Sequence, residues 1–259
     1  MTPIAQQKIR KAFSKAADRY DELATLQQTV GLRFLKSLQV APPKTALDIG
    51  MGTGWFTDNL ARQFPKAKVT GIDFASGMVE CARERKSRFN VIQAEAADLP
   101  FSDGCFDMIT SNLSYQWLDN LAAAFREVNR TLKVGGTFYF SAFAKNSLTE
   151  LIASIEKCEN GRSKEFLPKA LPSKEDYTNA LMKAGFQNIH VLSENFKVHF
   201  ASAMALVRWL KNIGANAGGG KSFWGKNRLL RIDEIYSEHF SENDKIVASF
   251  EVVWAKAKK

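Results

Sequence analysis

Apolar residues recur every three or four positions through residues 1–38, which is the spacing of one helix face. The periodic positions are Ile4, Ile9, Phe13, Ala16, Ala17, Tyr20, Leu23, Leu26, Val30, Phe34 and Leu38. Pro42 and Pro43 end the pattern, because proline lacks the N–H that a helix needs. The pattern predicts an N-terminal helical segment.

Beyond this segment, short apolar runs alternate with amphipathic stretches. The apolar runs predict strands at Thr45–Ile49, Lys68–Asp73, Phe89–Gln93, Cys105–Ser111 and Thr137–Phe143. The amphipathic stretches predict helices at Thr53–Phe64, Ser76–Lys86 and Asp119–Leu132, and the pair Gly135-Gly136 predicts a turn before the fifth strand. This alternation is typical of an α/β fold with a parallel sheet. Ligands bind such sheets beyond the carboxyl ends of the strands, so the loops that follow them should converge on one site.

After residue 145, predicted strands and helices no longer alternate regularly. Helices are expected at Ser147–Lys157, Ser173–Ala184, Ala203–Asn212 and Lys226–Phe240. Strands are expected at Asn188–Phe200 and Lys245–Ala255, as a late antiparallel pair. The glycine-rich stretch 214–220 indicates a mobile segment, a close approach to a ligand, or a plain surface linker.

The composition is that of a folded protein, with 45% hydrophobic and 24% charged residues. No apolar run approaches the roughly 18–20 residues that cross a bilayer. The N-terminus lacks the apolar core of a signal peptide, so we expect a cytoplasmic protein with no membrane partner. The net charge of +9 favours acidic partners: nucleic acid, an anionic membrane or an acidic protein.

Cysteines and histidines are too scattered for a metal site. Cys81, Cys105 and Cys158 form no CxxC pair, and the histidines form no HxxxH pair. We therefore expect no metal.

The segment Leu47–Gly54 is a glycine-rich turn between a predicted strand and a predicted helix. A dinucleotide fingerprint needs a small third residue where this chain has Trp55, and a P-loop needs a lysine that does not follow Gly54. What remains is the acidic Asp48 before a G-x-G-x-G run formed by Gly50, Gly52 and Gly54. The turn alone indicates only a nucleotide-like ligand.

Asp73 ends the second predicted strand, roughly 20 residues after Gly54. At this spacing a carboxylate accepts hydrogen bonds from ribose hydroxyls in nucleotide-binding βαβ units. The alternative is that Asp73 only caps the following helix.

The acidic residue, the G-x-G-x-G turn and Asp73 together resemble the class I S-adenosylmethionine-dependent methyltransferases. The resemblance implies a Rossmann-like fold, with a mostly parallel seven-stranded sheet, helices on both faces, N-terminal helices and a helical lid. It implies one domain over 1–259: a helical cap at 1–42, a cofactor-binding half at 43–145, and a substrate half at 146–259 with a lid insertion at about 201–240.

The resemblance also implies contacts to S-adenosylmethionine, residue by residue. The turn would hold the amino-acid end of the cofactor and Asp73 the ribose, with Phe74 and Met78 near the adenine. Glu95, where the family usually has Asp, would bind the adenine amino group. Asp98 is an alternative partner, and the Ala96 backbone could serve the ring. The remaining implied cofactor contacts are Tyr20, Gln27, Asn112 and Leu113.

Nucleic acid is not expected as the acceptor, despite the basic charge. Methyltransferases acting on base nitrogens usually carry an Asn/Asp/Ser-Pro-Pro-aromatic motif after the fourth strand, where this chain has Ser111–Trp117. Those acting on base carbons often use a Pro-Cys nucleophile, and no cysteine here follows a proline.

Over most of its length the sequence is similar to the malonyl-acyl-carrier-protein O-methyltransferases of biotin synthesis. The likeness is carried by the segments 12–20, 26–27, 111–117, 147–151 and 210–216. Departures are Met51, where Cys is common, and Val134, where Pro is common. The similarity implies an acyl-carrier protein bearing a malonyl group as partner.

The implied reaction methylates a carboxylate, which has a pKa of roughly 4 and is ionised at pH 7 without a general base. Catalysis then depends on positioning and exclusion of water. No residue is therefore assigned as catalytic with certainty, and Tyr20 and Gln116 are the positioning candidates. The acceptor side would use Trp117, Asn216 and a lid cation, either Arg208 or Lys211.

Other functions remain open at this stage. The same fold could methylate another small acid or a quinone. It could also bind S-adenosylmethionine in an assembly factor without methyl transfer, since binding alone would need the same glycines. An oxidoreductase with a dinucleotide cofactor is disfavoured by Trp55.

Overall fold

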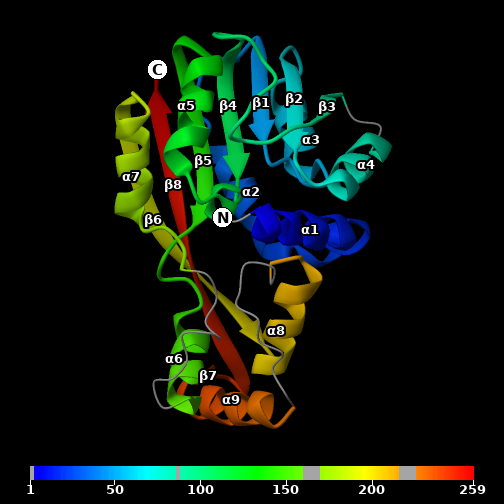
Figure 1. Ribbon diagram of the computed structural model, residues 1–259, viewed down its shortest axis with the longest axis vertical. Helices are drawn as coiled ribbons and strands as arrows, with labels where there is room; N and C mark the ends of the chain where they lie inside the picture. The colour runs from blue at the N-terminus through cyan, green and yellow to red at the C-terminus, as the bar shows by residue number, and fades with distance from the viewer. Residues whose placement is uncertain (1–2, 86–87, 160–169, 216–225) are drawn as a thin grey trace.

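The computed structural model describes residues 3–85, 88–159, 170–215 and 226–259. Within these residues, eight strands form one sheet in the order β3-β2-β1-β4-β5-β8-β6, with β7 beside β8 (Figure 1). The strands are β1 Thr45–Ile49, β2 Lys68–Asp73, β3 Asn90–Gln93, β4 Phe106–Asn112, β5 Leu132–Phe143, β6 Gln187–Phe200, β7 Ser241–Glu242 and β8 Lys245–Lys258. Strands β1 to β5 are parallel, and β8 runs antiparallel to β5, β6 and β7. The expected mostly parallel sheet and its late antiparallel pair, β6 and β8, are confirmed, and the short β7 is an eighth strand beyond the seven expected.

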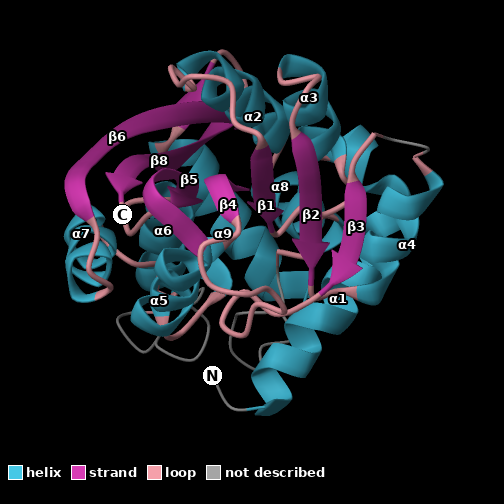
Figure 2. Cartoon of the chain, turned by 90° about the horizontal axis from the view of Figure 1, so that it is seen from above, coloured by secondary structure: helices cyan, strands magenta, loops and turns pink. Residues whose placement is uncertain are grey.

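Helices cover both faces of this sheet (Figure 2). They are α1 Pro3–Leu23, α2 Thr25–Ser37, α3 Trp55–Gln63, α4 Ser76–Glu84, α5 Leu121–Thr131, α6 Thr149–Cys158, α7 Lys174–Lys183, α8 Ala203–Asn212 and α9 Lys226–His239, with a 3-10 turn at Tyr115–Trp117. The N-terminal segment is thus two helices.

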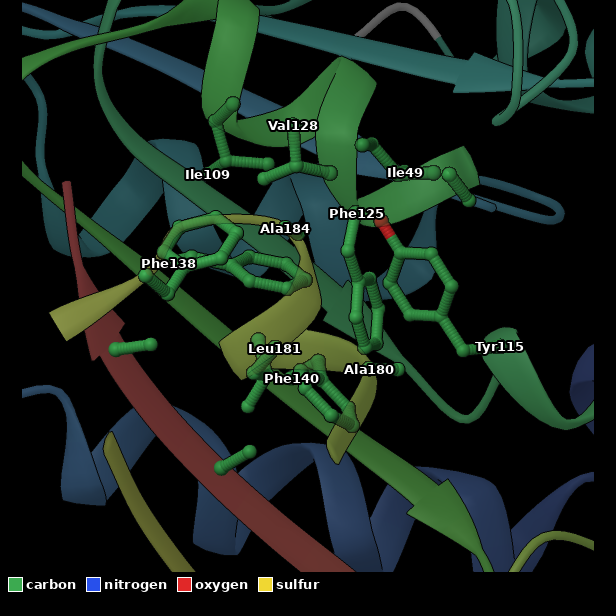
Figure 3. Close-up of a cluster of buried hydrophobic side chains, with 14 of the residues drawn as sticks. Ile49, Ile109, Tyr115, Phe125, Val128, Phe138, Phe140, Ala180, Leu181 and Ala184 are labelled. Carbon is green, nitrogen blue, oxygen red and sulfur yellow. The ribbon is translucent and has the colours of Figure 1, made fainter. Parts of the chain in front are cut away.

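Alternate residues of each strand face opposite layers of the core, as the pleat requires. On β1, Ala46 packs with α2, α3 and α4, whereas Leu47 packs with α5 and α7. The second layer centres on aromatic rings of α5 and β5, where Phe125 and Phe138 lie at 5.5 Å between centroids (Figure 3). This packing fixes the strand ends that the site uses.

The expected turn at Gly135-Gly136 is wrong, since both glycines lie within β5. Gly135 has a φ of +78° and donates its N–H to the Lys259 carbonyl at 3.1 Å. The pairing of β5 with β4 shifts register here, so the glycines form an irregularity inside the strand instead of ending it.

The long strands β6 and β8 continue past the parallel strands and carry α6, α8 and α9 (Figure 1). Of these helices, α8 and α9 fall within the segment 201–240 expected to form a lid. The lid contacts the N-terminal cap at α8. Trp209 Nε1 donates to the Leu23 carbonyl at 2.8 Å, and Gly214 approaches Ala12 and Phe13 so closely that a Cβ would lie 3.1 Å from the Phe13 ring. No helix in the described part of the chain is long and apolar enough to cross a membrane.

Candidate cofactor-binding site

A pocket lies at the carboxyl end of β1, under α1 and α2. The empty volume of the pocket is about 450 Å³, which includes the space open to solvent at its mouth. Its walls come from the first two helices, the glycine-rich turn, the start of α3 and the end of β4: Tyr20, Asp21, Ala24, Gln27, Gln28, Asp48, Gly50, Met51, Gly52, Thr53, Trp55, Phe56 and Asn112. In Figure 1 the arrowheads of β1 and β4 point toward α1. Six residues expected to bind cofactor therefore line one pocket: Tyr20, Gln27, Asp48, Gly50, Gly52 and Asn112.

The glycine-rich turn depends on its glycines for both conformation and space. Gly50, Gly52 and Gly54 have φ values of +73°, +56° and +82°, which disfavour other residues. A Cβ on Gly50 would lie 2.0 Å from Ser114 Oγ, and one on Gly54 would lie 2.7 Å from the Phe89 ring. Gly50 and Gly52 form the pocket wall, and Gly54 sets the start of α3.

Asp48 supports the turn from inside the sheet. Its buried carboxylate accepts hydrogen bonds from Thr57 Oγ1 at 2.5 Å and Thr110 Oγ1 at 3.1 Å. Burial raises the pKa of Asp48 to about 7, although both hydroxyls lower it. These bonds tie β1 to α3 and β4, so Asp48 has a structural role in addition to its place in the pocket wall.

Asp73 joins two loops of the site. Its Oδ2 accepts from the Gly52 N–H at 2.9 Å and its Oδ1 from the Ala75 N–H at 2.9 Å. Burial raises the pKa of Asp73 to about 6, against the effect of these hydrogen bonds. A carboxylate has about four lone-pair positions, and the Phe74 N–H also donates to Asp73, so one position remains for a ribose hydroxyl.

The surface expected to meet adenine is covered by α1. Ala17 of α1, Ala75 and Met78 form a small buried cluster, and Met78 is 2% exposed. Phe13, Tyr20, Phe74 and Cys81 pack around it. The N-terminal cap thus lies directly over Phe74 and Met78.

Glu95 also contacts α1. It forms an ion pair with Arg10 and accepts from Gln6 Nε2 at 3.0 Å. Ala96 is partly buried against the core, whereas Asp98 is exposed.

The end of β4 contributes Asn112 to the pocket wall, and the segment that follows supports it. Asn112 Nδ2 donates to the Gln27 carbonyl at 3.2 Å, and Asn112 Oδ1 accepts from Ser141 Oγ at 2.7 Å. Leu113 has a φ of +53°, an unusual conformation for this residue that is held by a hydrogen bond from its N–H to the Ser141 carbonyl. The side chain of Gln116 is buried and donates to the Leu113 carbonyl at 2.6 Å, which supports this strained turn.

The residues expected to bind the acceptor do not lie together in one place. Trp117 packs edge-on against Phe13 of α1, with 5.2 Å between ring centroids. Arg208 and Lys211 are exposed on α8 and do not line the pocket, so their role stays a prediction. Asn216 lies outside the described residues.

The pocket also contains residues that the sequence did not single out for binding. Asp21 accepts from Thr53 Oγ1 at 2.5 Å and pairs with Arg85 of the segment after α4. Trp55, whose size does not fit a dinucleotide fingerprint, lines the pocket and faces Gly31 of α2. Tyr20, Ala24, Gln27 and Gln28 recur at the three- to four-residue spacing of a helix, although they span the junction of α1 and α2, and this spacing could have identified the wall.

Among the described residues, no group of three or more His, Cys, Asp or Glu side chains is arranged to hold a metal ion.

Comparison with known proteins places this chain in a family. Residues 47–140 match the methyltransferase domain. A malonyl-acyl-carrier protein O-methyltransferase of Geobacter sulfurreducens is 32% identical over 99% of this chain and 100% of its own length. The fold is similar to that of the YcgJ protein from Bacillus subtilis, with a TM-score of 0.61 and 19% identity over 90% of this chain and 98% of that one.

A second solved structure has the same fold and contains a ligand. A Haemonchus contortus phosphoethanolamine N-methyltransferase in complex with S-adenosylhomocysteine gives a TM-score of 0.56 at 19% identity, over 88% of this chain and 52% of that one. The full-length relationship to the Geobacter protein is the stronger finding, because it spans the cap and the lid as well as the domain core. This chain belongs to the malonyl-acyl-carrier protein O-methyltransferase family.

Proposed function

We propose that this protein transfers the methyl group of S-adenosylmethionine to the free carboxylate of a malonyl thioester carried by acyl-carrier protein, a step of biotin synthesis. The observation that carries the proposal is the relationship to the Geobacter sulfurreducens enzyme over the whole of both chains. The pocket at the carboxyl end of β1 supports it, because that is where a sheet of this kind binds its ligand.

The residues present fit the cofactor. The Gln27 side chain is buried, and its Oε1 has no hydrogen-bond partner among the described residues. An unpaired buried acceptor costs free energy, so an N–H from a ligand in the pocket would stabilise it. Asp73 has an acceptor position left for a ribose hydroxyl, and Gly50 and Gly52 allow a ligand to approach the backbone.

When bound, S-adenosylmethionine supplies an electrophilic methyl group on a sulfonium ion. The chain itself needs only to bring the acceptor carboxylate into line and keep water out, because the carboxylate is already ionised at pH 7. The helices α1 and α2 cover the pocket and so keep water out. Tyr20 of α1 and Gln27 of α2 line the pocket on this side. Arg208 or Lys211 would bind the malonyl carboxylate, and Trp117 and Asn216 would line the acceptor path.

The basic surface suits an acidic carrier protein in the cytoplasm. Among the protein's surface cations, Arg10 is paired with Glu95, whereas Lys11 and Lys145 are exposed and have no ion pair in the described structure. The side chain of Lys226 lies outside the described residues. Unpaired surface cations raise the association rate with an anionic partner.

The direct test combines purified protein, S-adenosylmethionine and malonyl-acyl-carrier protein, followed by mass spectrometry of the carrier. A mass gain of one methyl group, with equimolar S-adenosylhomocysteine, is the expected result. Parallel reactions with succinyl-carrier protein and with quinones test the other acceptors. Methylation of those acceptors alone would refute the malonyl assignment, and cofactor binding without transfer to any acceptor would indicate an assembly factor.

A further inference from the structure

The helix α1 approaches the cofactor-binding half at its centre through backbone contact with α4. Ser14 Oγ accepts from the Gly77 N–H at 3.3 Å. A Cβ on Gly77 would lie 2.4 Å from the Ser14 carbonyl oxygen, so the two helices touch without side chains between them. Ala17 packs on Met78 one turn further along α1.

Polar contacts hold both ends of this helix. Near its C-terminus, Asp21 pairs with Arg85 and accepts from Thr53 Oγ1 in the glycine-rich turn. Near its N-terminus, Arg10 forms an ion pair with one carboxylate oxygen of Glu95 and Gln6 donates a hydrogen bond to the other. The cap is therefore fastened on both sides of the surface expected to hold adenine.

The carboxylate of Glu95 is directed at α1 by the loop that carries it. The Glu95 carbonyl accepts from the Asp98 N–H at 3.2 Å, which closes a tight turn and fixes the backbone. Both carboxylate oxygens contact α1, and the Arg10 guanidinium also lies 5.7 Å from the centroid of the Phe74 ring. A shorter Asp would withdraw the carboxylate by about 1.5 Å, one C–C bond length, and weaken both contacts.

We propose that Glu95 is a positioning residue that retains the cofactor through α1, by fastening Arg10 and Gln6, and does not itself read the adenine amino group. The inference rests on the proposed function for the identity of the ligand. Because the cap lies over Phe74 and Met78, ligand release requires α1 to move, and the Glu95–Arg10 pair opposes that movement.

A double-mutant cycle tests this coupling. Release of S-adenosylhomocysteine is measured by stopped flow in Arg10→Ala, Glu95→Gln and the double variant. Each single variant should release the ligand about two- to five-fold faster, the range for a partly exposed ion pair. The double variant should be no faster than Glu95→Gln, which weakens both contacts of Glu95 with α1, and Glu95→Asp should behave like Glu95→Gln. A further loss on adding Glu95→Gln to a Gln6→Ala, Arg10→Ala variant, in which both α1 partners of Glu95 are already absent, would show direct contact with the ligand and overturn the proposal.

Arg19→Ala is the matched control. Arg19 lies on the same helix, and its ion pair in the described structure is with Glu22, at 3.7 Å, also on α1. The variant therefore removes the same charge from α1 without unfastening the helix, and ligand release should stay at the wild-type rate. Equal acceleration by Arg19→Ala would mean that charge alone acts, which would also overturn the proposal.

Hydrogen exchange of the ligand-free protein separates this inference from the proposed function. Amides of α1 should exchange faster in Arg10→Ala and Glu95→Gln than in Arg19→Ala. If wild-type protein binds no S-adenosylhomocysteine, the proposed function fails, while faster α1 exchange still supports the fastening role. Unchanged exchange in both variants would refute that role regardless of the ligand.

Discussion

The Asp73 carboxylate accepts a hydrogen bond from the Gly52 backbone N–H, with 2.9 Å between Oδ2 and the nitrogen. This bond joins the end of β2 to the glycine-rich turn after β1. The residue expected to hold the ribose therefore also shapes the turn expected to hold the amino-acid end of the cofactor. Both parts of the site should respond to one titration.

The first prediction is that cofactor affinity falls as the pH drops through about 6, the raised pKa of Asp73. The ionised carboxylate accepts from Gly52 and from a ribose hydroxyl, so its protonation removes acceptors. The affinity for the cofactor is therefore highest above the pKa of Asp73 and is lost as the pH falls below it. Calorimetry with S-adenosylhomocysteine between pH 5 and 8 measures the change. Asp73→Asn should bind at least about tenfold more weakly at pH 8, since charged hydrogen bonds contribute about 1.5–3 kcal/mol.

A control variant separates this titration from that of Asp48, whose pKa of about 7 is close to it. Asp48→Asn should keep the fall near pH 6, and Asp73→Asn should lose it. A pH-independent affinity in the wild type would contradict a role for Asp73.

The second prediction concerns the space beside Gly50. Gly50→Ala combines a strained φ of +73° with a Cβ 2.0 Å from Ser114 Oγ. Gly104→Ala has a similar φ of +63° but nothing within 4 Å of the new Cβ. Strain alone costs about 1–2 kcal/mol, so Gly50→Ala should lower the free energy of unfolding by clearly more. Urea denaturation measures the difference. Adding Ser114→Gly to Gly50→Ala should recover it, and equal costs at the two glycines would show that the steric argument is wrong.

The parallel half of the fold could be predicted because its signals are local. The bounds of β1 and β2 agree with the expected Thr45–Ile49 and Lys68–Asp73, since each is an apolar run between turn residues. The two-residue strand β7 could not be predicted, because it exists only by pairing with β8. The turn expected at Gly135 is wrong because glycine with a positive φ occurs in β-bulges as well as in turns, and the sequence alone does not distinguish them.

The candidate site also contains some residues that local sequence signals identify and others that only the fold brings together. The glycines and Asp73 are recognisable because their spacing along the chain carries the signal. The contacts of Asp21 with Arg85 and of Arg10 with Glu95 join side chains 64 and 85 residues apart, so no sequence pattern marks them. Glu95 was expected to bind adenine, and only the packing of α1 brings Arg10 to it.

A third prediction assigns Tyr20 a hydrogen-bonding role without proton transfer. Burial, with Asp73 and Asp21 nearby, raises the pKa of Tyr20 above its usual value, so the phenol stays protonated. Tyr20→Phe should lower kcat about fivefold, equivalent to one hydrogen bond of about 1 kcal/mol. The pH profile should keep its shape. Tyr139→Phe is the control, because the Tyr139 hydroxyl is buried, has no hydrogen-bond partner among the described residues and lies outside the pocket. Full turnover in Tyr20→Phe would leave its hydroxyl no chemical role.

A fourth prediction follows from the net charge of +9. Association with the acidic carrier protein should weaken between about 0.1 M and 1 M salt, where the screening length falls from about 10 to 3 Å. Binding measured by calorimetry at several salt concentrations tests this. Lys11→Glu should weaken binding further at low salt and converge with the wild type at high salt. A flat salt response would reject electrostatic steering.

The last prediction distinguishes the two lid cations. Arg208 and Lys211 lie on α8, away from its buried Leu206, where they either bind the malonyl carboxylate or remain solvated. Removal of the binding cation takes away a charge-assisted hydrogen bond in both the ground and transition states, so KM for malonyl-carrier protein should rise while kcat stays constant. The rise should be about 10- to 100-fold for one of Arg208→Ala and Lys211→Ala, since such a bond contributes about 1.5–3 kcal/mol. Lys183→Ala, an exposed lysine of α7, controls for the general loss of positive charge. If KM is unchanged in both α8 variants, neither cation binds the acceptor, and the carboxylate must be held by another part of the chain.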